Sequence, residues 1–246
     1  MSPGRIPVAI VGAHGRLGGF AAGLLEARED FELVGRFDAG DDWQRQVGVC
    51  GARVALEATV AGLGYAHAMA LLEAGVRPVV ATSGVTPEQC EKLDRYARQR
   101  GLGGLVVPNF SLGVLLVQRF AAEAARHFPD AEIVELHHER KPDAPSGTAA
   151  ETARRIQAAR CAAPRTPRRP DEPRDRGGLH DDVPVHSIRL PGLYAHQEVL
   201  FGGAGETLTL RHDMSGPAAF GPGILSALRH AAGAIGVARG LEHALA

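Results

Sequence analysis

Residues 137–148 combine side chains that can bind an anionic substrate and move a proton. His137 and His138 follow an apolar run, Lys141 comes next, and Ser146-Gly147-Thr148 lead into helix-forming residues. An imidazole exchanges protons near neutral pH, and a lysine ammonium adds a compact positive charge. This pattern predicts a strand, a polar turn and a helix start that bring these groups to one cavity.

The start of that helix is predicted to bind a carboxylate. Ser146 is a suitable N-cap, and Gly147 leaves its backbone amide unobstructed. Free amides, the helix dipole and the hydroxyls of Ser146 and Thr148 together favour an anion. The alternative is a capped helix beside surface histidines and a surface lysine. His138 is expected on the strand face opposite to His137, where a structural role is more common. No metal site is predicted, because the helical histidine spacing and the cysteine cluster are both missing.

A second candidate binding element is a glycine-rich turn near residue 12. Gly12, Gly15 and Gly18 lie between an apolar strand-like run and an apolar helix. Gly12 permits the tight turn, Gly15 lets the backbone approach a pyrophosphate, and Gly18 lets the helix lie close to the sheet. The amides and the dipole at the helix terminus favour an anion. Glycines also end strands for structural reasons, but this position after a strand predicts nucleotide binding.

Asp38 ends the next strand-like run, where an acid commonly binds the adenosine ribose. Its carboxylate would repel a 2′-phosphate and so favours NADH. Arg16 and Arg36 are nearby in the sequence and could weaken that preference. Residues 38–41 could also form only a turn. The predicted cofactor is therefore NADH or NADPH.

Two kinds of element order position these groups. Strands and helices alternate in the first part, which predicts a doubly wound, Rossmann-like parallel sheet covered on both faces. Its strands are expected at 6–11, 31–37, 54–58, 76–82 and 105–107, and its helices at 17–27, 65–74 and 87–99.

After residue 109 the pattern changes to a mixed α+β domain with an open antiparallel sheet. Helices are expected at 112–128, 146–159 and 223–233, and strands at 131–138, 183–190, 196–201 and 206–212. The dinucleotide-binding domain is predicted at 1–109, completed by 216–246. A substrate-binding and oligomerisation domain is predicted at 110–215.

Residues 160–182 are rich in Arg, Pro, Asp and Gly and are expected to form a long polar loop. A basic RNA-binding arm is the alternative, although acids interrupt the basic residues. Across all 246 residues, 45% are hydrophobic, 22% are charged and the formal net charge is -1, which gives no reason to expect nucleic-acid or membrane binding.

The cysteines Cys50, Cys90 and Cys161 are far apart and fit a reducing compartment. Neither a signal-peptide core nor a run of about 18 apolar residues occurs. A cytoplasmic protein is expected.

The run Glu-Leu-His-His-x-x-Lys-x-Asp-Ala-Pro-Ser-Gly-Thr-Ala at 135–149 resembles the signature of dihydrodipicolinate reductases (4-hydroxy-tetrahydrodipicolinate reductases). Other similar segments are the glycine turn and residues 38–41, 81–84, 108–111 and 184–213. The resemblance implies NADH- or NADPH-dependent reduction of a cyclic dicarboxylate imine in diaminopimelate and lysine biosynthesis. It also implies a homotetramer built on the second domain's sheet, and a C-terminal segment that returns to the nucleotide domain.

The resemblance also implies roles for individual residues. His137 corresponds to an acid/base residue, and Lys141 to a proton donor or substrate-orienting residue. The implied substrate contacts are His138, Ser146, Gly147 and Thr148. The implied cofactor contacts are Gly12, Gly15, Arg16, Leu17, Gly18, Asp38, Ala81, Thr82, Ser83, Pro108, Asn109 and Phe110. Hinges are implied near Asn109 and Ser215.

The sequence departs from the family pattern on the cofactor side. Residues 57–61 read Glu-Ala-Thr-Val-Ala where an Asp-Phe-Thr-x-Pro-like strand end is usual. Ala81 replaces a usual glycine, and Pro217 stands where arginine is common. Glu139 and Arg140 lie at positions that more commonly hold basic residues or histidine. These changes leave two rival interpretations open. One is a diverged reductase acting on another imine or amino acid, and the other is a non-catalytic nucleotide sensor.

Overall fold

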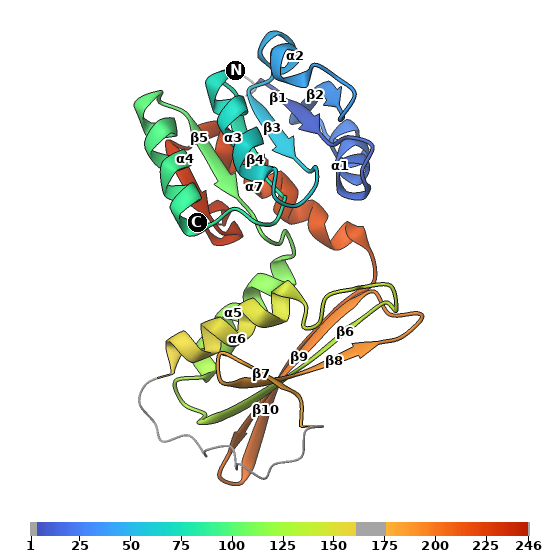
Figure 1. Ribbon diagram of the computed structural model, residues 1–246, viewed down its shortest axis with the longest axis vertical. Coiled ribbons are helices and arrows are strands. Elements are labelled where there is room, and N and C mark those ends of the chain that lie inside the picture. The colour runs from blue at the N-terminus through green and yellow to red at the C-terminus, as the bar shows by residue number, and fades with distance from the viewer. Residues whose placement is uncertain (1–3, 161–175, 246) are drawn as a thin grey trace. The chain divides into compact units, whose positions relative to one another are not determined.

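The structure is a computed structural model that describes residues 4–160 and 176–245 (Figure 1). It divides into two compact units. The parallel-sheet unit contains Met1–Ser111 and Phe220–Ala246, and the mixed-sheet unit contains Leu112–Ala219. These boundaries lie a few residues from those expected. No helix among the described residues is both long and apolar enough to cross a membrane.

The parallel-sheet unit is built on a six-stranded sheet in the order β11-β5-β4-β3-β1-β2, in which all neighbours pair in parallel. Because the strands are parallel, their carboxyl ends meet at one edge of the sheet. The strands are β1 (Ile6–Val11), β2 (Phe31–Phe37), β3 (Val54–Glu57), β4 (Arg77–Val80), β5 (Gly103–Val106) and β11 (Gly236–Arg239).

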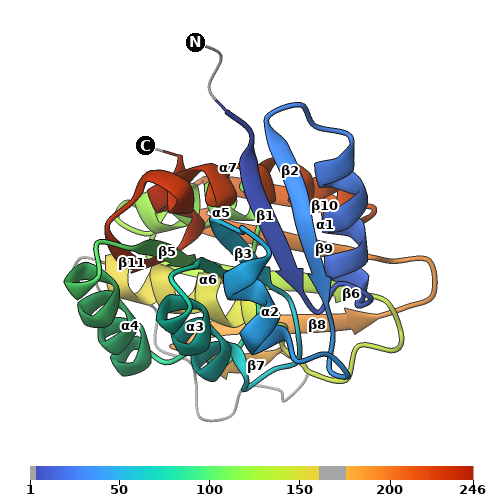
Figure 2. The same ribbon diagram turned by 90° about the horizontal axis from the view of Figure 1, so that it is seen from above.

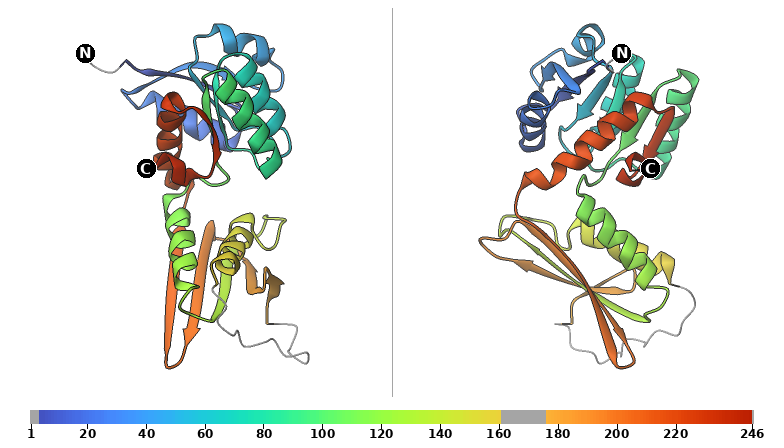
Figure 3. Two further views of the ribbon diagram at one scale, coloured as in Figure 1. Left: turned by 90° about the vertical axis from the view of Figure 1, so that its left-hand side faces the viewer. Right: turned by 180° about the vertical axis from the view of Figure 1, so that it is seen from behind.

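Helices cover both faces of this sheet, as the left panel of Figure 3 shows for α7 on one face and α3 and α4 on the other. One layer contains α1 (Arg16–Glu26) and α7 (Gly221–Gly233). The other contains α2 (Trp43–Val49), α3 (Gly64–Glu73) and α4 (Pro87–Gln99). Short 3-10 helices occupy Pro217–Phe220 and Leu241–Ala244. Figure 2 shows α1 beside β1 and β2. The predicted doubly wound sheet is confirmed.

Two elements of this unit were not expected from the sequence. In α2 only Trp43 and Val47 are buried, so its hydrophobic periodicity is too weak to identify. Strand β11 has four residues and pairs with β5, which returns the C-terminal segment to this sheet.

The mixed-sheet unit has a five-stranded sheet in the order β10-β9-β6-β8-β7. The expectation that strands 183–190, 196–201 and 206–212 pair in sequence is wrong for the first two. Strand β6 lies between β8 and β9, parallel to β8 and antiparallel to β9. The sheet is therefore mixed. Its strands are β6 (Asp130–His137), β7 (Gly178–His180), β8 (Val183–Arg189), β9 (Ala195–Gly203) and β10 (Glu206–Met214).

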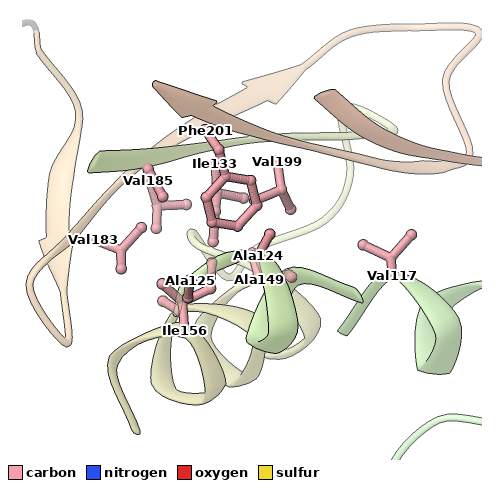
Figure 4. Close-up of a cluster of buried hydrophobic side chains, with 13 residues drawn as sticks. Val117, Ala124, Ala125, Ile133, Ala149, Ile156, Val183, Val185, Val199 and Phe201 are labelled. Carbon is pink, nitrogen blue, oxygen red and sulfur yellow. The ribbon is translucent and has the colours of Figure 1, made fainter. Parts of the chain in front are cut away.

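Helices α5 (Leu112–Ala124) and α6 (Gly147–Ala159) pack together against one face of this sheet. Figure 4 shows the core between them, where Ile133, Val199 and Phe201 from the strands meet Ala149 and Ile156 from α6. In β6, Ala131, Ile133 and Glu135 are buried in alternation, so Glu135 faces the helices together with apolar side chains.

Two further expectations about this unit need correction. The helix expected at 112–128 ends at Ala124, because the chain turns at residues 125–127 before β6. The loop expected at 160–182 contains strand β7, which pairs with β8 through Leu179 and Pro184. Residues 161–175, including Cys161, lie outside the described part of the chain.

Candidate active site

Helix α6 begins with the expected cap. The Ser146 hydroxyl accepts a hydrogen bond from the Ala149 amide at 3.2 Å. Gly147 is the first helical residue, and a Cβ built on it would meet nothing within 4 Å. Its amide has no partner within the helix, since the first four amides of a helix lack one. The open space beside Gly147 therefore lets a carboxylate approach this terminus.

Hydrogen bonds from buried polar side chains hold the first turn of α6. The Thr152 hydroxyl donates to the Thr148 carbonyl oxygen at 2.8 Å, and the Gln197 amide donates to Thr152 at 3.0 Å. Gln118 of α5 donates to the same hydroxyl at 3.4 Å. Thr148 itself is half-buried. Because both glutamines are buried, this network holds the helix start in place.

Glu135 is a fully buried carboxylate directly behind His137, and the sequence analysis did not identify it. Its side chain is 0% exposed. Its Oε2 atom lies 2.5 Å from Nδ1 of His137, and its Oε1 accepts a hydrogen bond from the Ser146 amide at 3.2 Å. One carboxylate therefore links the end of β6 to the cap of α6. It orients His137 so that Nε2 is the ring atom left for a ligand.

Arg189 forms a two-pronged ion pair with Glu135. Its Nη1 donates to Oε2 at 3.0 Å and its Nη2 donates to Oε1 at 2.8 Å. The pair forms because β6 and β8 run in parallel with His137 opposite Arg189. Nη2 also donates to the Asp143 carbonyl oxygen at 2.6 Å, which ties the polar turn to the sheet. Bidentate pairs of this kind are strong and geometrically specific.

This arrangement keeps the Glu135 carboxyl charged. Burial by itself would raise its pKa, but the hydrogen bonds from His137 and Arg189 outweigh burial and lower the pKa to about 2. The charged carboxylate therefore stays available as the acceptor that holds Nδ1 of His137.

Lys141 is held by Asp143 in the turn after β6. Its Nζ lies 2.8 Å from Oδ1 of Asp143, and its amide donates to the His138 carbonyl oxygen at 3.1 Å. The hydrogen bond from Lys141 lowers the pKa of Asp143. The Lys141 side chain is 21% exposed, so its ammonium is partly withdrawn from water but accessible.

His138 follows the last residue of β6. Its Nδ1 is buried and has no hydrogen-bond partner among residues 4–160 and 176–245. A buried polar atom without a partner is unusual in a folded protein and is accounted for when a ligand supplies the missing hydrogen bond. Hydrogen bonds thus link this segment: Glu135 joins His137 to the Ser146 amide, and Arg189 joins Glu135 to the Asp143 carbonyl oxygen in the turn that carries Lys141.

The glycine turn in the parallel-sheet unit has the expected close approaches. Gly12 has φ +89, and a Cβ there would lie 2.5 Å from the Ala58 carbonyl oxygen. A Cβ on Gly18 would lie 2.0 Å from the Gly12 carbonyl oxygen. Gly15 is the N-cap of α1 and makes no side-chain cap. The first amides of α1 therefore face a cradle without a side chain, which fits the pyrophosphate of a dinucleotide.

Asp38 follows β2, and its Oδ2 accepts a hydrogen bond from the His14 amide at 2.7 Å. The His14 imidazole also lies 2.9 Å from Oδ2. Arg36 is ion-paired with Glu26. Oδ2 is thus held by the glycine turn, which leaves the other carboxylate oxygen for a ribose.

The remaining predicted cofactor residues follow β4 and β5 at the same sheet edge. Thr82 is buried and donates to Glu57, while Ser83 is exposed. Their neighbour Ala81 is half-buried. The Asn109 side chain accepts from the Ser111 amide at 2.8 Å, and the Phe110 side chain is only 3% exposed. Arg16 and Pro108 are exposed and Leu17 is half-buried.

Comparison with known proteins covers nearly the whole chain. Residues 6–110 match the family model "Dihydrodipicolinate reductase, N-terminus", and residues 113–245 match "Dihydrodipicolinate reductase, C-terminus". A 4-hydroxy-tetrahydrodipicolinate reductase of Beutenbergia cavernae is 46% identical over 243 residues, which cover 96% of this chain and 97% of that protein. One from Coxiella burnetii is 42% identical over 227 residues, 91% of this chain and 92% of its own.

A solved structure agrees with these sequence relatives. The dipicolinate-bound dihydrodipicolinate reductase from Paenisporosarcina sp. TG-14 has a TM-score of 0.85 and 34% identity, covering 97% of this chain and 98% of that one. The resemblance noted at residues 135–149 and the predicted fold class are both confirmed. The chain therefore belongs to the dihydrodipicolinate (4-hydroxy-tetrahydrodipicolinate) reductase family.

Proposed function

We propose that this chain reduces 4-hydroxy-tetrahydrodipicolinate to tetrahydrodipicolinate in the diaminopimelate and lysine pathway, with a nicotinamide cofactor as reductant. The observation that carries the proposal is the β6–α6 segment, where Glu135 joins His137 to the Ser146 amide at the start of α6 and Arg189 joins Glu135 to the turn that carries Lys141. Family membership supports the same reaction. The relatives from Beutenbergia cavernae and Coxiella burnetii bear the corresponding name.

Loss of the substrate hydroxyl as water gives the α,β-unsaturated cyclic imine, and reduction of that imine then requires a hydride and a proton. The side chains of this protein are assigned to the proton. When bound, the reduced nicotinamide supplies the hydride to a ring carbon of the unsaturated imine. Glu135 holds His137 by Nδ1 at 2.5 Å, so a proton on Nε2 points away from the buried carboxylate. Lys141 provides a second proton donor, an ammonium group that also attracts the dianionic substrate.

Substrate orientation is assigned to the start of α6. The amides of Gly147 and Thr148, with the Ser146 hydroxyl beside them, are assigned to one substrate carboxylate. His138 Nδ1, buried without a partner among the described residues, is a further candidate contact. Binding the carboxylate at a fixed helix start holds the ring in one orientation and lowers the entropy cost of reaction.

Asp38 supports NADH as the preferred cofactor. Its carboxylate repels a 2′-phosphate, and Arg36 is already ion-paired with Glu26, so Arg36 does not offset that repulsion. Arg16 is exposed at the start of α1 and allows NADPH to bind with lower affinity.

The assembly is proposed to be a cytoplasmic homotetramer joined through the mixed sheet. The sheet face opposite α5 and α6 carries the exposed apolar side chains Ile188 and Leu200, which are 40% and 36% exposed. Apolar side chains on an uncovered sheet face suit burial against another copy of the chain.

Oxidation of NADH and NADPH by the purified protein, with freshly generated 4-hydroxy-tetrahydrodipicolinate, tests the proposal. We expect rapid oxidation with this substrate and a higher kcat/KM for NADH than for NADPH. Parallel assays with other cyclic imines and with keto acids plus ammonia separate the diverged-reductase alternative. Faster turnover of one of those substrates would contradict the proposed reaction. Nucleotide binding without turnover of any acceptor would instead support a sensor.

A further inference from the structure

A buried carboxylate, Glu57, lies beneath the sheet edge assigned to the cofactor. Glu57 is the last residue of β3, and its side chain is 0% exposed. A buried carboxylate is costly unless several donors satisfy it. The donors around Glu57 therefore indicate what its charge stabilises.

Three side chains from three separate segments meet at Glu57. Its Oε2 accepts a hydrogen bond from the buried Thr82 hydroxyl, which follows β4. Its Oε1 accepts from the Thr59 hydroxyl and from the Thr59 amide at 3.2 Å. Nδ1 of His67, in the first turn of α3, lies 3.1 Å from Oε1. The His67 ring packs edge-on against Trp43 of α2, with centroids 5.0 Å apart.

Backbone hydrogen bonds also join the loop that follows β3 to the loop that follows β4. The Ala81 amide donates to the Glu57 carbonyl oxygen at 2.8 Å, and the Gly62 amide donates to the Ser83 carbonyl oxygen at 3.2 Å. A Cβ on Gly84, which has φ +100, would lie 3.4 Å from the Gly62 amide nitrogen. The β3–α3 loop and the β4–α4 loop therefore form one rigid shelf.

We propose that Glu57 is a positioning residue for the cofactor: through Thr82, Thr59 and His67 it fixes the shelf of residues 81–84 that contacts the dinucleotide. This inference rests on the proposed function for the location of that site. Glu57 touches no reacting atom, because it is fully buried. It acts by holding the exposed backbone and Ser83 in the binding conformation, so less order must be gained when the cofactor binds.

The test compares Glu57→Gln and Thr82→Val with the wild-type protein. Each variant removes one side of a charge-assisted hydrogen bond, and we expect each to raise the Kd for NADH about tenfold. The double variant should be little worse than Glu57→Gln alone, because that variant already weakens the contact that Thr82→Val removes. Thr82→Ser keeps the hydroxyl and should restore wild-type affinity.

A second measurement reports on the shelf without cofactor or turnover. Amide hydrogen exchange at residues 81–84 should accelerate about tenfold in Glu57→Gln and in Thr82→Val. Thr86→Val is the matched control, because it removes the side-chain cap of α4 in the same loop without touching Glu57. That control should lower thermal stability while leaving the Kd for NADH unchanged.

The outcomes separate the two proposals. An unchanged NADH Kd and unchanged exchange in Thr82→Val, which is close to isosteric, would overturn the role of Glu57 even if Glu57→Gln fails to fold. A rise in Kd no larger in Glu57→Gln than in Thr86→Val would overturn it too. A wild-type protein that binds NADH but reduces no dicarboxylate imine would remove the proposed reaction and leave the Glu57 assignment standing. A wild-type protein that binds neither cofactor would overturn both.

Discussion

The N-termini of α1 and α6 both leave backbone amides open to an anion, but they differ in their caps and in the space around them. The N-cap of α1 is Gly15, which makes no side-chain cap, whereas the N-cap of α6 is Ser146, whose hydroxyl accepts a hydrogen bond from the Ala149 amide. The backbone at the N-terminus of α1 requires glycine at Gly12 and Gly18, because a Cβ at either position would collide with neighbouring backbone atoms. At Gly147 of α6 the space is open.

The difference fits the roles proposed for the two sites. A pyrophosphate needs several free amides and little else, so the α1 turn is built from backbone geometry. A reacting substrate needs fixed charges as well, so the α6 start is joined to His137, Glu135 and Arg189. Substitutions should therefore act through shape at α1 and through charge at α6.

The largest expected effect is at Lys141. Lys141→Ala removes a proton donor and a positive charge, and kcat should fall about thousandfold, or about 4 kcal/mol. The Kd for NADH should stay the same. Arg140→Ala is the matched control, because Arg140 is a neighbouring cation that is 85% exposed and paired only with Glu139 in the salt bridges described. Stopped-flow and steady-state assays that find wild-type kcat in Lys141→Ala would refute its assignment.

Glu135→Gln should affect both stability and catalysis. Removing one member of a buried ion pair leaves Arg189 uncompensated, so the free energy of unfolding should fall by about 3 kcal/mol. Loss of the charge behind His137 should also lower kcat, by about a hundredfold. Glu151→Gln is the control, because hydrogen bonds from Arg154 and Arg155 likewise outweigh burial and lower the pKa of Glu151 to about 2, yet no contact to His137 is involved. Equal kcat values for the two variants would argue against orientation by Glu135.

The same carboxylate predicts a pH dependence. The folded-state pKa of Glu135 is about 2, below its ordinary value of 4.5, so the unfolded chain takes up a proton first as pH falls. Its contribution to stability is complete above pH 4.5 and is lost as the pH falls to about 2. Urea unfolding at several pH values should show this loss in the wild type. In Glu135→Gln the free energy of unfolding should depend less steeply on pH.

A pair of glycine substitutions tests shape against charge. Gly12→Ala places a Cβ 2.5 Å from the Ala58 oxygen at φ +89, and it should cost about 2 kcal/mol of stability and weaken NADH binding. Gly147→Ala has room for its Cβ and should leave stability unchanged or slightly higher. Its effect should be a severalfold higher substrate KM. Equal losses of stability at both positions would remove the distinction between the two helix starts.

The smallest effect is expected at the cap itself. Ser146→Ala should lower stability by about 1 kcal/mol, because the Ala149 amide loses its partner. Ser146→Gly should cost only a few tenths of a kcal/mol. Thermal denaturation checks both, and a loss for Ser146→Ala no greater than for Ser146→Gly would show that the cap contributes little.

Local sequence patterns were sufficient to predict the bounds of several helices and strands. The bounds of Ile6–Val11, Phe31–Phe37 and Pro87–Gln99 agree with the prediction, and Ser146 is the N-cap that its sequence indicated. Strand neighbours were harder to predict. The crossover that places β6 between β8 and β9 depends on contacts distant in the sequence.

The buried charges were the main features that sequence reasoning missed. Glu135 alternates with Ala131 and Ile133 on one strand face, and a charged residue in that register is a signal of a buried functional pair. Its partner Arg189 could not be named, because nothing local links residues 135 and 189. Glu57 was noted only as a departure from the family, while its partners Thr82 and His67 become apparent in three dimensions.

The pairing of β11 with β5 sets the order in which the protein can be completed during synthesis. The mixed-sheet unit is continuous in the chain and can fold as soon as Ala219 has left the ribosome. The parallel sheet must wait for residues 236–239 to close its edge. Until then the backbone of β5 offers an unpaired edge that can associate with other chains. The mixed-sheet unit can therefore form before the parallel sheet is complete, and the unpaired edge of β5 is an aggregation risk in the interval between the two.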